Sequence, residues 1–413
     1  MFVSINPNNV VTASSDRHFL VNGQKTLEVD VPQGVSLIGK VFRPKNTIKS
    51  MSDMKIAIVC NWQTRCGIST YSSYLVSALR KQVKEVRIFS EYAATKTAED
   101  GPDVDRCWRR GESLVGLSKK IKQWNPDFVI IQHEFGIFPN AFFFMQLMQL
   151  LENVPHVVTL HSVYEHLDKI VYSASIRNII VHTQQGKEVL QKMGNTSKIF
   201  VIPHGCVSFP DAQELWNIMQ NPYTVMQFGF GFAYKGVDRA LNAIHYLKTS
   251  DQKFANIFYF YLISDNDFNS RVHLEYYNSL CEKVKELGLD DNVAIYRKYQ
   301  SEQMLNLYLR LAKLAIFPYL NNPNNTVYGS SGAIRIALAN KCPVIASESH
   351  LFDDLNTIVP RPDGHIALAT EIDRVFSNGQ YRQQLIDRGQ EFISNNSWDE
   401  VATQYLALIE HAK

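Results

Sequence analysis

Short apolar runs alternate with helix-like runs along most of this 413-residue sequence. From Met54 onward, the segments KIAIVC, VRIFS, DFVIIQH, HVVTLH, NIIVHT and KIFVIPH have the length and composition of buried strands. Between several of them lie runs with helical spacing, such as YSSYLVSALRKQ and GKEVLQKM. Strands separated by helices predict a parallel sheet with helices on both faces. We therefore expect a Rossmann-like domain over residues 51–215.

The alternation restarts after residues 208–222, which we interpret as a linker. The segments YTVMQFGF, IFYFYLIS, NVAIYR, LAIFPY and PVIA predict a second parallel sheet, with helices such as residues 274–287 between its strands. We expect this domain to span residues 216–395. Residues 1–50 carry turn residues and alternating segments such as LEVDV and VSLIGKVF, which predict a small β appendage. The predicted fold class is α/β, with two tandem doubly wound Rossmann-like domains.

Composition narrows the functional classes. The 42 Lys and Arg against 40 Asp and Glu give a net charge of +2, far from the basic balance of a dedicated nucleic-acid binder. The six cysteines contain no CxxC pair and indicate reduced thiols. No signal peptide is visible and no apolar run reaches about 18 residues, so we expect a cytoplasmic protein without a transmembrane segment. Kinase, zinc peptidase and serine hydrolase motifs are absent from the sequence.

The segment YGSSGAIRIALANKCPVIAS, residues 328–347, carries the strongest site signal. Ser330, Ser331 and Gly332 precede AIRIALA, which has helical spacing, and PVIA predicts a buried strand. The first amides of a helix have no internal partners and carry the positive end of its dipole, so small residues there let a phosphate approach. An ordinary Ser/Gly helix cap is the alternative.

Other candidate residues lie on loops that follow strands, where doubly wound sheets bind their ligands. After the first strand, Gly67 and Ile68 lie in a glycine turn that leads to a Ser/Thr helix start, as needed where backbone approaches a ligand. His133 and Glu134 lie at the end of the strand DFVIIQH, and His161 ends HVVTLH. A histidine at a strand end can hydrogen-bond a polar ligand and titrate near neutrality. A simple cap and structural histidines are the alternatives.

Lys235, in GFGFAYKG, follows the first strand of the second domain. A lysine between a glycine-bearing strand end and a helix start, in the same sheet as the Ser330 turn, suits a diphosphate. An exposed lysine at a helix start is the alternative. Together these loops predict that the second domain binds a diphosphate and the first binds a polyol.

At this point the sequence resembles a nucleotide-sugar glycosyltransferase of the GT-B fold, in the retaining family numbered four and its mannosyltransferase-like subgroup. The resemblance runs from Met54 to the C-terminal end. It rests on the order and spacing of KIAIVCNWQTRCGISTY, IIQHEFGIF, VVTLH, IIVHT, VIPHG, GFAYKG, FPY and SSGAIRIALANKCPVIAS. It implies sugar transfer with retention of anomeric configuration, from a nucleotide diphosphate sugar and without a metal or other cofactor. It also implies that residues 396–413 cross back onto the first domain.

The resemblance assigns roles to the candidate residues. His161 contacts the sugar or the acceptor and Lys235 contacts the diphosphate, so these two are the predicted catalytic residues. Gly67 lies near the transferred sugar, and the amides of Ser331 and Gly332 hold the distal phosphate. The predicted donor-binding set is Gly67, Tyr328, Ser330, Ser331, Gly332 and Ala333, and the predicted acceptor or sugar side is Ile68, His133 and Glu134.

The sequence departs from the family pattern at three positions. The family usually has an arginine five residues before the lysine, where this chain has Phe230. It also usually has two glutamates eight residues apart, where this chain has Tyr328 and Ile336. Arg335 is adjacent to Ile336 but points about 100° away on a helix, so it is no obvious substitute.

The sequence leaves three hypotheses about the function open, of which two differ in the acceptor. The first is a growing polysaccharide or lipid-linked glycan, with possible peripheral membrane contact. The second is a hydroxylated base in phage DNA, because residues 1–215 hold 24 Lys and Arg against 19 Asp and Glu, with Arg106, Arg109 and Arg110 around Trp108. A solvated helix face with core tryptophans is the alternative for this basic segment. The third is a non-catalytic sugar-binding protein.

Overall fold

A computed structural model describes residues 11–15, 18–21, 24–28, 50–93, 95–165, 176–209, 221–264, 270–322 and 326–411. Its contacts divide the chain into two units, Met1–Lys49 and Ser50–Lys413. In the first unit, β1 (Val11–Ser15), β2 (His18–Val21) and β3 (Gln24–Glu28) form an antiparallel sheet in that order. The predicted segment VSLIGKVF and most of the predicted linker lie outside the described residues.

The second unit begins with a parallel seven-stranded sheet of order β11-β10-β8-β7-β4-β5-β6. Its strands are β4 (Lys55–Cys60), β5 (Glu85–Glu91), β6 (Val104–Trp108), β7 (Phe128–His133), β8 (His156–Leu160), β10 (Asn178–Val181) and β11 (Lys198–Val201). The apolar runs predicted six of these strands. They did not predict β6, because VDRCW is polar and its first four residues are only half-buried.

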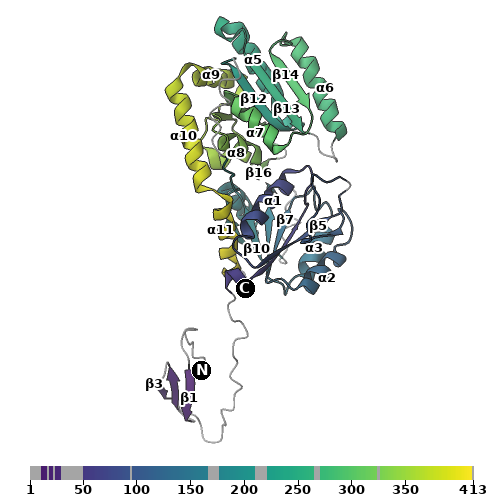
Figure 1. Cartoon of the computed structure of the whole chain (residues 1–413), viewed down its shortest axis with the longest axis vertical. Coiled ribbons are helices and arrows are strands. Elements are labelled where there is room, and N and C mark those ends of the chain that lie inside the picture. Colours follow the sequence, from purple (N-terminus) through teal and green to yellow (C-terminus); the bar gives the residue numbers. More distant parts are fainter. Residues whose placement is uncertain are drawn as a thin grey trace. The chain divides into compact units, whose positions relative to one another are not determined.

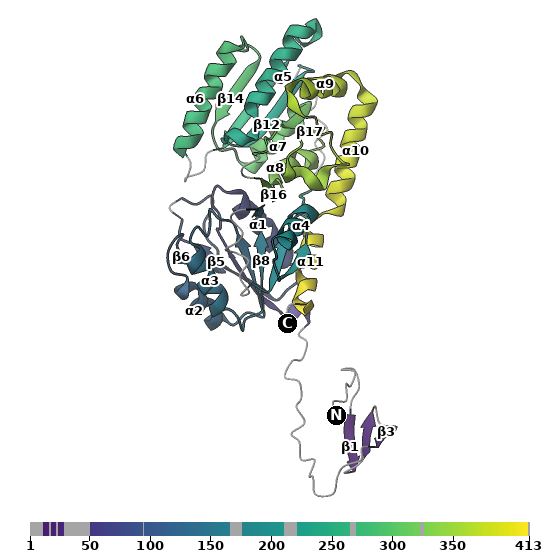
Figure 2. The same ribbon diagram turned by 180° about the vertical axis from the view of Figure 1, so that it is seen from behind.

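Helices cover both faces of this sheet (Figures 1 and 2). Alternate residues of each strand point to opposite faces, so each strand serves two cores. One core joins the sheet to α1 (Gly67–Leu79) and α11 (Trp398–His411). The other joins it to α2 (Val115–Trp124), α3 (Ala141–Leu150) and α4 (Gln184–Lys192). Helix α11 packs along α1, so the C-terminal helix completes the first core.

A parallel five-stranded sheet of order β14-β13-β12-β15-β17 follows. Its strands are β12 (Thr224–Phe230), β13 (Phe258–Ser264), β14 (Val293–Arg297), β15 (Leu314–Phe317) and β17 (Val344–Ala346). Its helices are α5 (Val237–Ser250), α6 (Ser270–Glu286), α7 (Glu302–Leu311), α8 (Gly332–Ala339), α9 (Gly364–Ser377) and α10 (Gly379–Asn395). Helix α6 begins four residues before the predicted start. Two parallel sheets covered by helices confirm the predicted α/β fold class.

Two short strands that the sequence did not predict join the two sheet regions. Strand β9 (Ser162–Tyr164) follows β8, and β16 (Val327–Gly329) precedes α8. They pair antiparallel, with Ser162 opposite Gly329 and Tyr164 opposite Val327. Both are three residues long, too short for a periodic pattern to show. This pairing brings the segment after His161 directly against the segment before Ser330.

Among the described residues, no helix is long and apolar enough to cross a membrane.

Candidate functional site

The N-terminus of α8 is the centre of the site. The cap residue Ser331 has extended backbone angles, and its side chain makes no capping hydrogen bond. Within the described part of the chain, the amides of Gly332 and Ala333 have no hydrogen-bond acceptor. These two N–H groups lie at the positive end of the helix dipole, so they can bind an anion.

The predicted role of the Ser331 amide is wrong in this structure. The Ser331 N–H donates to the carbonyl oxygen of Leu351 at 3.1 Å, so it has no capacity left for a phosphate. Leu351 belongs to the 3₁₀ segment η6 (His350–Leu355), which follows β17 and wraps the start of α8. The hydroxyl of Ser330 donates to Asp354 of the same segment at 3.3 Å. The free amides therefore begin at Gly332.

Lys235 lies beside this helix start. It ends the 3₁₀ segment η4 (Ala233–Lys235) after β12, and only 9% of the residue is exposed. Its Nζ lies 3.9 Å from the centroid of the Tyr319 ring. Burial raises the pKa of Tyr319, and the nearby Ser331 side chain opposes that rise. Tyr319 thus lies between Lys235 and the start of α8. In the described part of the chain, Lys235 has no carboxylate partner.

The β9–β16 pairing brings the first domain to the same place. A Cβ atom on Gly329 would lie 2.6 Å from the carbonyl oxygen of His161, so only glycine fits this close approach. His204, in the loop after β11, also reaches the helix: a Cβ atom on Gly332 would lie 3.1 Å from its Nε2. Residues from both sheets therefore surround the free amides.

His161 belongs to a cluster of buried and half-buried polar and aromatic side chains. Its Nε2 lies 2.7 Å from Oε1 of Gln132, and its Nδ1 lies 3.4 Å from Nε2 of His182. The ring of Tyr71 packs against His161, His182 and His204, with centroids 4.7, 5.2 and 5.0 Å away. Among the described residues, no group of three His, Cys, Asp or Glu side chains is arranged to hold a metal ion.

Burial keeps these imidazoles neutral. Burial and, to a smaller extent, the nearby Arg335 guanidinium together lower the pKa of His182 to about 4, against a hydrogen bond with the Ile202 carbonyl oxygen that raises it. Burial also lowers the pKa of His161 and His204 well below the usual histidine range. Arg335 itself is 1% exposed and pairs with Asp354. Its Nε donates to the carbonyl oxygen of His204 at 3.2 Å, which ties α8 to the first sheet.

His133, the last residue of β7, and Glu134, the residue after it, have different positions. His133 is 1% exposed and packs against Phe138 and Phe144, so it is a core residue and the predicted contact with a ligand is wrong. Glu134 is half-buried and accepts hydrogen bonds from the Ser162 hydroxyl (2.7 Å) and the Phe135 amide (3.0 Å). Burial raises its pKa. Because Ser162 belongs to β9, Glu134 lies next to the strand pairing.

The predicted glycine loop opens α1. Gly67 is exposed and is the first residue of the helix, Ile68 is half-buried, and Cys66 makes no side-chain cap. A Cβ atom on Gly67 would meet nothing within 4 Å, so the space above this helix start is open. Arg65, in the same loop, lies 5.3 Å from the ring of Tyr299, which follows β14.

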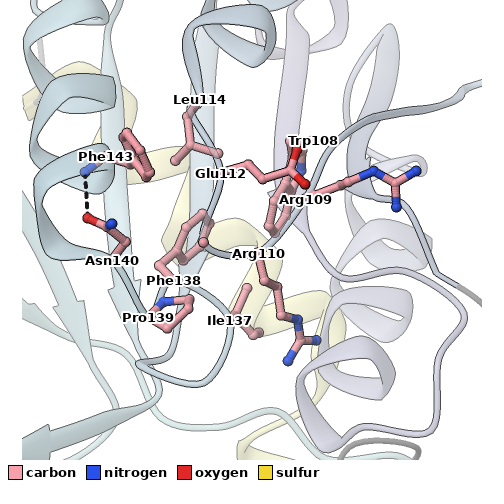
Figure 3. A pocket seen from close by; sticks show the side chains of 11 residues that line it. Trp108, Arg109, Arg110, Glu112, Leu114, Ile137, Phe138, Pro139, Asn140 and Phe143 are labelled. Atoms are coloured by element: carbon pink, nitrogen blue, oxygen red, sulfur yellow. Dashed lines mark hydrogen bonds between the residues drawn. The ribbon is translucent and has the colours of Figure 1, made fainter.

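Ion pairs neutralise much of the basic segment around Trp108. Arg106 pairs with Asp100 at 2.7 Å and Arg110 with Glu91 at 2.6 Å. Figure 3 shows a small depression bordered by Trp108, Arg110 and the loop of residues 137–140. Its empty volume is about 180 Å³, and Trp108 below it is 3% exposed. The segment is therefore largely a structural ion-pair region on an aromatic core.

Sequence reasoning missed His182, His204 and Tyr319 as parts of the site. Each follows a strand: β10, β11 and β15. The two histidines lie in IIVHT and VIPHG, at strand ends like that of His161. The signal that selected His161 was thus present for both.

Comparison with known proteins was consistent with this geometry. Residues 66–207 match the sequence profile described as Glycosyltransferase Family 4. The match is confined to this segment, which is less than half of the chain. The family 4 segment covers most of the first sheet region and ends just after His204. No curated protein matches the full sequence.

Solved structures extend the likeness to the rest of the fold. Sucrose-phosphate synthase from Thermosynechococcus elongatus has 16% identity and a TM-score of 0.69, over 87% of this chain and 98% of that one. The Anabaena protein Alr3699/HepE, solved with UDP and glucose, has 14% identity and a TM-score of 0.66, over 87% and 100%. A UDP-forming trehalose-phosphate synthase from Burkholderia xenovorans has 11% identity and a TM-score of 0.67, over 86% and 99%.

These matches are to glycosyltransferase structures of the GT-B fold. At these identities they establish the fold, and the family 4 profile matches part of the first domain. The predicted fold is confirmed. The mannosyltransferase-like subgroup stays a prediction.

Proposed function

We propose that this chain transfers a sugar, with retention of anomeric configuration, from a nucleoside diphosphate sugar to a hydroxyl of a growing polysaccharide or lipid-linked glycan. One observation carries the proposal. The β9–β16 pairing holds His161 of the family 4 segment against the start of α8, where two amides and Lys235 are free to bind an anion.

The donor diphosphate is the group that this end of the second sheet suits. A diphosphate leaving group gains negative charge as the bond to the sugar breaks, and fixed cations and N–H dipoles stabilise that charge. Lys235 supplies the cation, and the amides of Gly332 and Ala333 supply the dipoles. Since these groups are held by η4 and by α8, little reorganisation is needed when the charge develops.

The sugar then lies toward the first domain. In a retaining transfer the leaving phosphate can accept the proton of the incoming hydroxyl, so no separate base is needed. His161 lies at the end of β8, where it can hydrogen-bond the sugar or the acceptor. Glu134 and the open start of α1 at Gly67 border the same edge of the first sheet.

A glycan acceptor fits the charge distribution better than DNA. Arg106, Arg110 and Lys120 are paired with Asp100, Glu91 and Asp105, so they have little charge left to bind phosphates.

The test is transfer from a panel of UDP-, GDP- and ADP-sugars, with GDP-mannose included for the predicted subgroup. Release of free nucleoside diphosphate is measured with and without oligosaccharide and lipid-linked acceptors. Release that depends on one donor and rises with a glycan acceptor supports the proposal. Release stimulated only by DNA with hydroxymethylated bases would replace the acceptor class.

The departures from the family pattern favour one other function, a non-catalytic sugar-binding protein. Phe230 stacks on His273 with ring centroids 6.3 Å apart, and Tyr328 donates to Glu165 at 3.3 Å, so neither position offers a charge to the donor. Tight binding of a nucleotide sugar without hydrolysis or transfer, across the whole panel, would favour this function.

A further inference from the structure

A pair of histidines, of which His182 is buried and His161 half-buried, lies behind the start of α8. His161 follows β8 and His182 follows β10, and the two strands are neighbours in the first sheet. Nδ1 of His161 faces Nε2 of His182 at 3.4 Å, and the ring centroids are 5.2 Å apart. His182 belongs to the cluster around His161, but no contact with a ligand has been assigned to it above.

The outer nitrogen of each ring faces an acceptor. Nδ1 of His182 lies 3.0 Å from the carbonyl oxygen of Ile202, and Nε2 of His161 lies 2.7 Å from Oε1 of Gln132. Carbonyl oxygens only accept hydrogen bonds, so with Oε1 of Gln132 turned toward His161 both outer nitrogens carry hydrogen. A neutral imidazole has a single N–H, so both inner nitrogens are bare. The neutral pair therefore points two lone pairs at each other.

We infer that His182 completes the donor site: with His161 it takes up one proton from solvent when a nucleoside diphosphate binds, and holds it between the facing nitrogens. The inference rests on the proposed function and adds a residue and a charge to it. Only an N–H bond forms, so the pair gains one positive charge.

Several groups face the pair and determine when it can be charged. They are Tyr71 of α1, Gln132 and His133 of β7, Thr159 of β8, His204 after β11, Arg335 of α8 and Tyr405 of α11. Among the described groups facing it, none is a carboxylate. Without a ligand, burial and the Arg335 charge keep the pair neutral.

A bound diphosphate changes this balance because it places negative charge near the pair. The His204 ring centroid is 5.9 Å from that of His182, and His204 Nε2 closely approaches Gly332 at the start of α8. The anion site and the pair are thus separated by one imidazole. A diphosphate carries more than one negative charge, whereas Lys235 supplies one positive charge. A proton on the pair supplies a second positive charge, and because His182 is 2% exposed, water screens that charge only weakly.

Calorimetric titration with UDP at neutral pH, in buffers of different ionisation enthalpy, measures the protons taken up on binding. GDP and ADP are titrated in the same way. The test variant is His182→Asn, because an asparagine amide keeps a donor for Ile202 but lacks the inner nitrogen. The control is His156→Asn, which is also buried and lies on β8, but at the opposite edge of the sheet. The difference between proteins cancels protons exchanged by the nucleotide itself.

The wild type and His156→Asn should take up about one proton more than His182→Asn. Their affinity for UDP should also rise as the pH falls, by up to about tenfold per pH unit relative to His182→Asn. As a second readout on the unchanged protein, ¹⁵N-histidine NMR should show one ring becoming imidazolium-like when UDP is added. This readout holds even if His182→Asn does not fold.

Equal proton uptake in all three proteins, or unchanged ring signals in the bound wild type, would overturn the inference. In that case the Gln132 amide donates to Nε2 of His161, and Nδ1 of His161 carries the hydrogen. That hydrogen then points to the bare Nε2 of His182, so the neutral pair is satisfied. Failure of UDP, GDP and ADP to bind would instead refute the nucleotide-sugar proposal, and the inference with it.

Discussion

Replacing Lys235 by methionine separates the role of its charge from the role of its stem. The side chain is 9% exposed, its Nζ lies over the Tyr319 ring, and its Cε lies 3.7 Å from the Cβ position of Gly229. Methionine keeps an unbranched apolar stem of similar size in this space. Lys235→Met therefore removes the ammonium group and little else.

The expected loss is in turnover rather than in folding. Removing one preorganised donor to a developing anion costs about 10²- to 10³-fold in turnover, or about 3–4 kcal/mol of transition-state stabilisation. For folding, Lys235→Met loses a cation–π contact of about 1–2 kcal/mol. It also removes a largely buried cation that has no carboxylate partner in the described part of the chain. These terms oppose each other, so stability should change by only about 1 kcal/mol.

The assay is release of nucleoside diphosphate from the best donor of the panel, with thermal unfolding measured on the same preparations. Lys248→Met is the matched control, because Lys248 lies on α5 and its Nζ donates to the carbonyl oxygen of Gly288. It should transfer sugar at the wild-type rate. Wild-type turnover in Lys235→Met would refute the reasoning. So would a loss of activity that simply follows a loss of folded protein.

Three further predictions concern the surroundings of the site. Gly329→Ala places a Cβ 2.6 Å from the His161 carbonyl oxygen. It should destabilise the protein by about 1–3 kcal/mol, seen as a lower thermal midpoint. An unchanged midpoint would mean that β9 and β16 are not paired. Arg335→Met should destabilise the protein by about 3–5 kcal/mol in urea unfolding, because it leaves the Asp354 charge without its partner. Adding Asp354→Asn to this variant should recover part of the lost stability. No recovery would contradict the pairing. Burial raises the folded-state pKa of Glu134 above its unfolded value, so the native state loses stability as the pH rises through these pKa values. Glu134→Gln should therefore raise the thermal midpoint near neutral pH, with a gain that disappears in acid below the unfolded pKa; a gain that is constant with pH would exclude this cause.

The sequence predicted the parts of the fold that depend on local patterns. The buried strands β4, β7 and β13 are nearly continuous apolar runs, which is what a parallel sheet with two covered faces requires. Strand β6 was missed because its exposed edge position tolerates polar residues, and β9 and β16 were missed because three residues show no period. Those two strands nevertheless bring the site together. Their pairing depends on contacts between residues more than 160 positions apart.

The sequence could select candidate site residues only by their position along a strand. Lys235 and His161 lie at strand ends and beside the start of α8, and their roles stay predictions. The prediction failed for the Ser331 amide, because its acceptor Leu351 comes from a 3₁₀ segment whose fold the sequence pattern does not show. It failed for His133 because consecutive residues at a strand end point to opposite sides. His133 points to the face of the sheet that carries the aromatic core.

The position of α11 has a consequence for the order in which the protein acquires its structure during translation. Residues from Trp398 to Ile409 fill one face of the first sheet, beside α1, although α1 begins at Gly67. A nascent chain that has left the ribosome up to residue 395 still exposes the apolar surface that α11 later covers. The first half of the molecule therefore matures only after the second half has been synthesised, and a ribosome stalled before residue 398 would hold a chaperone substrate rather than a finished domain.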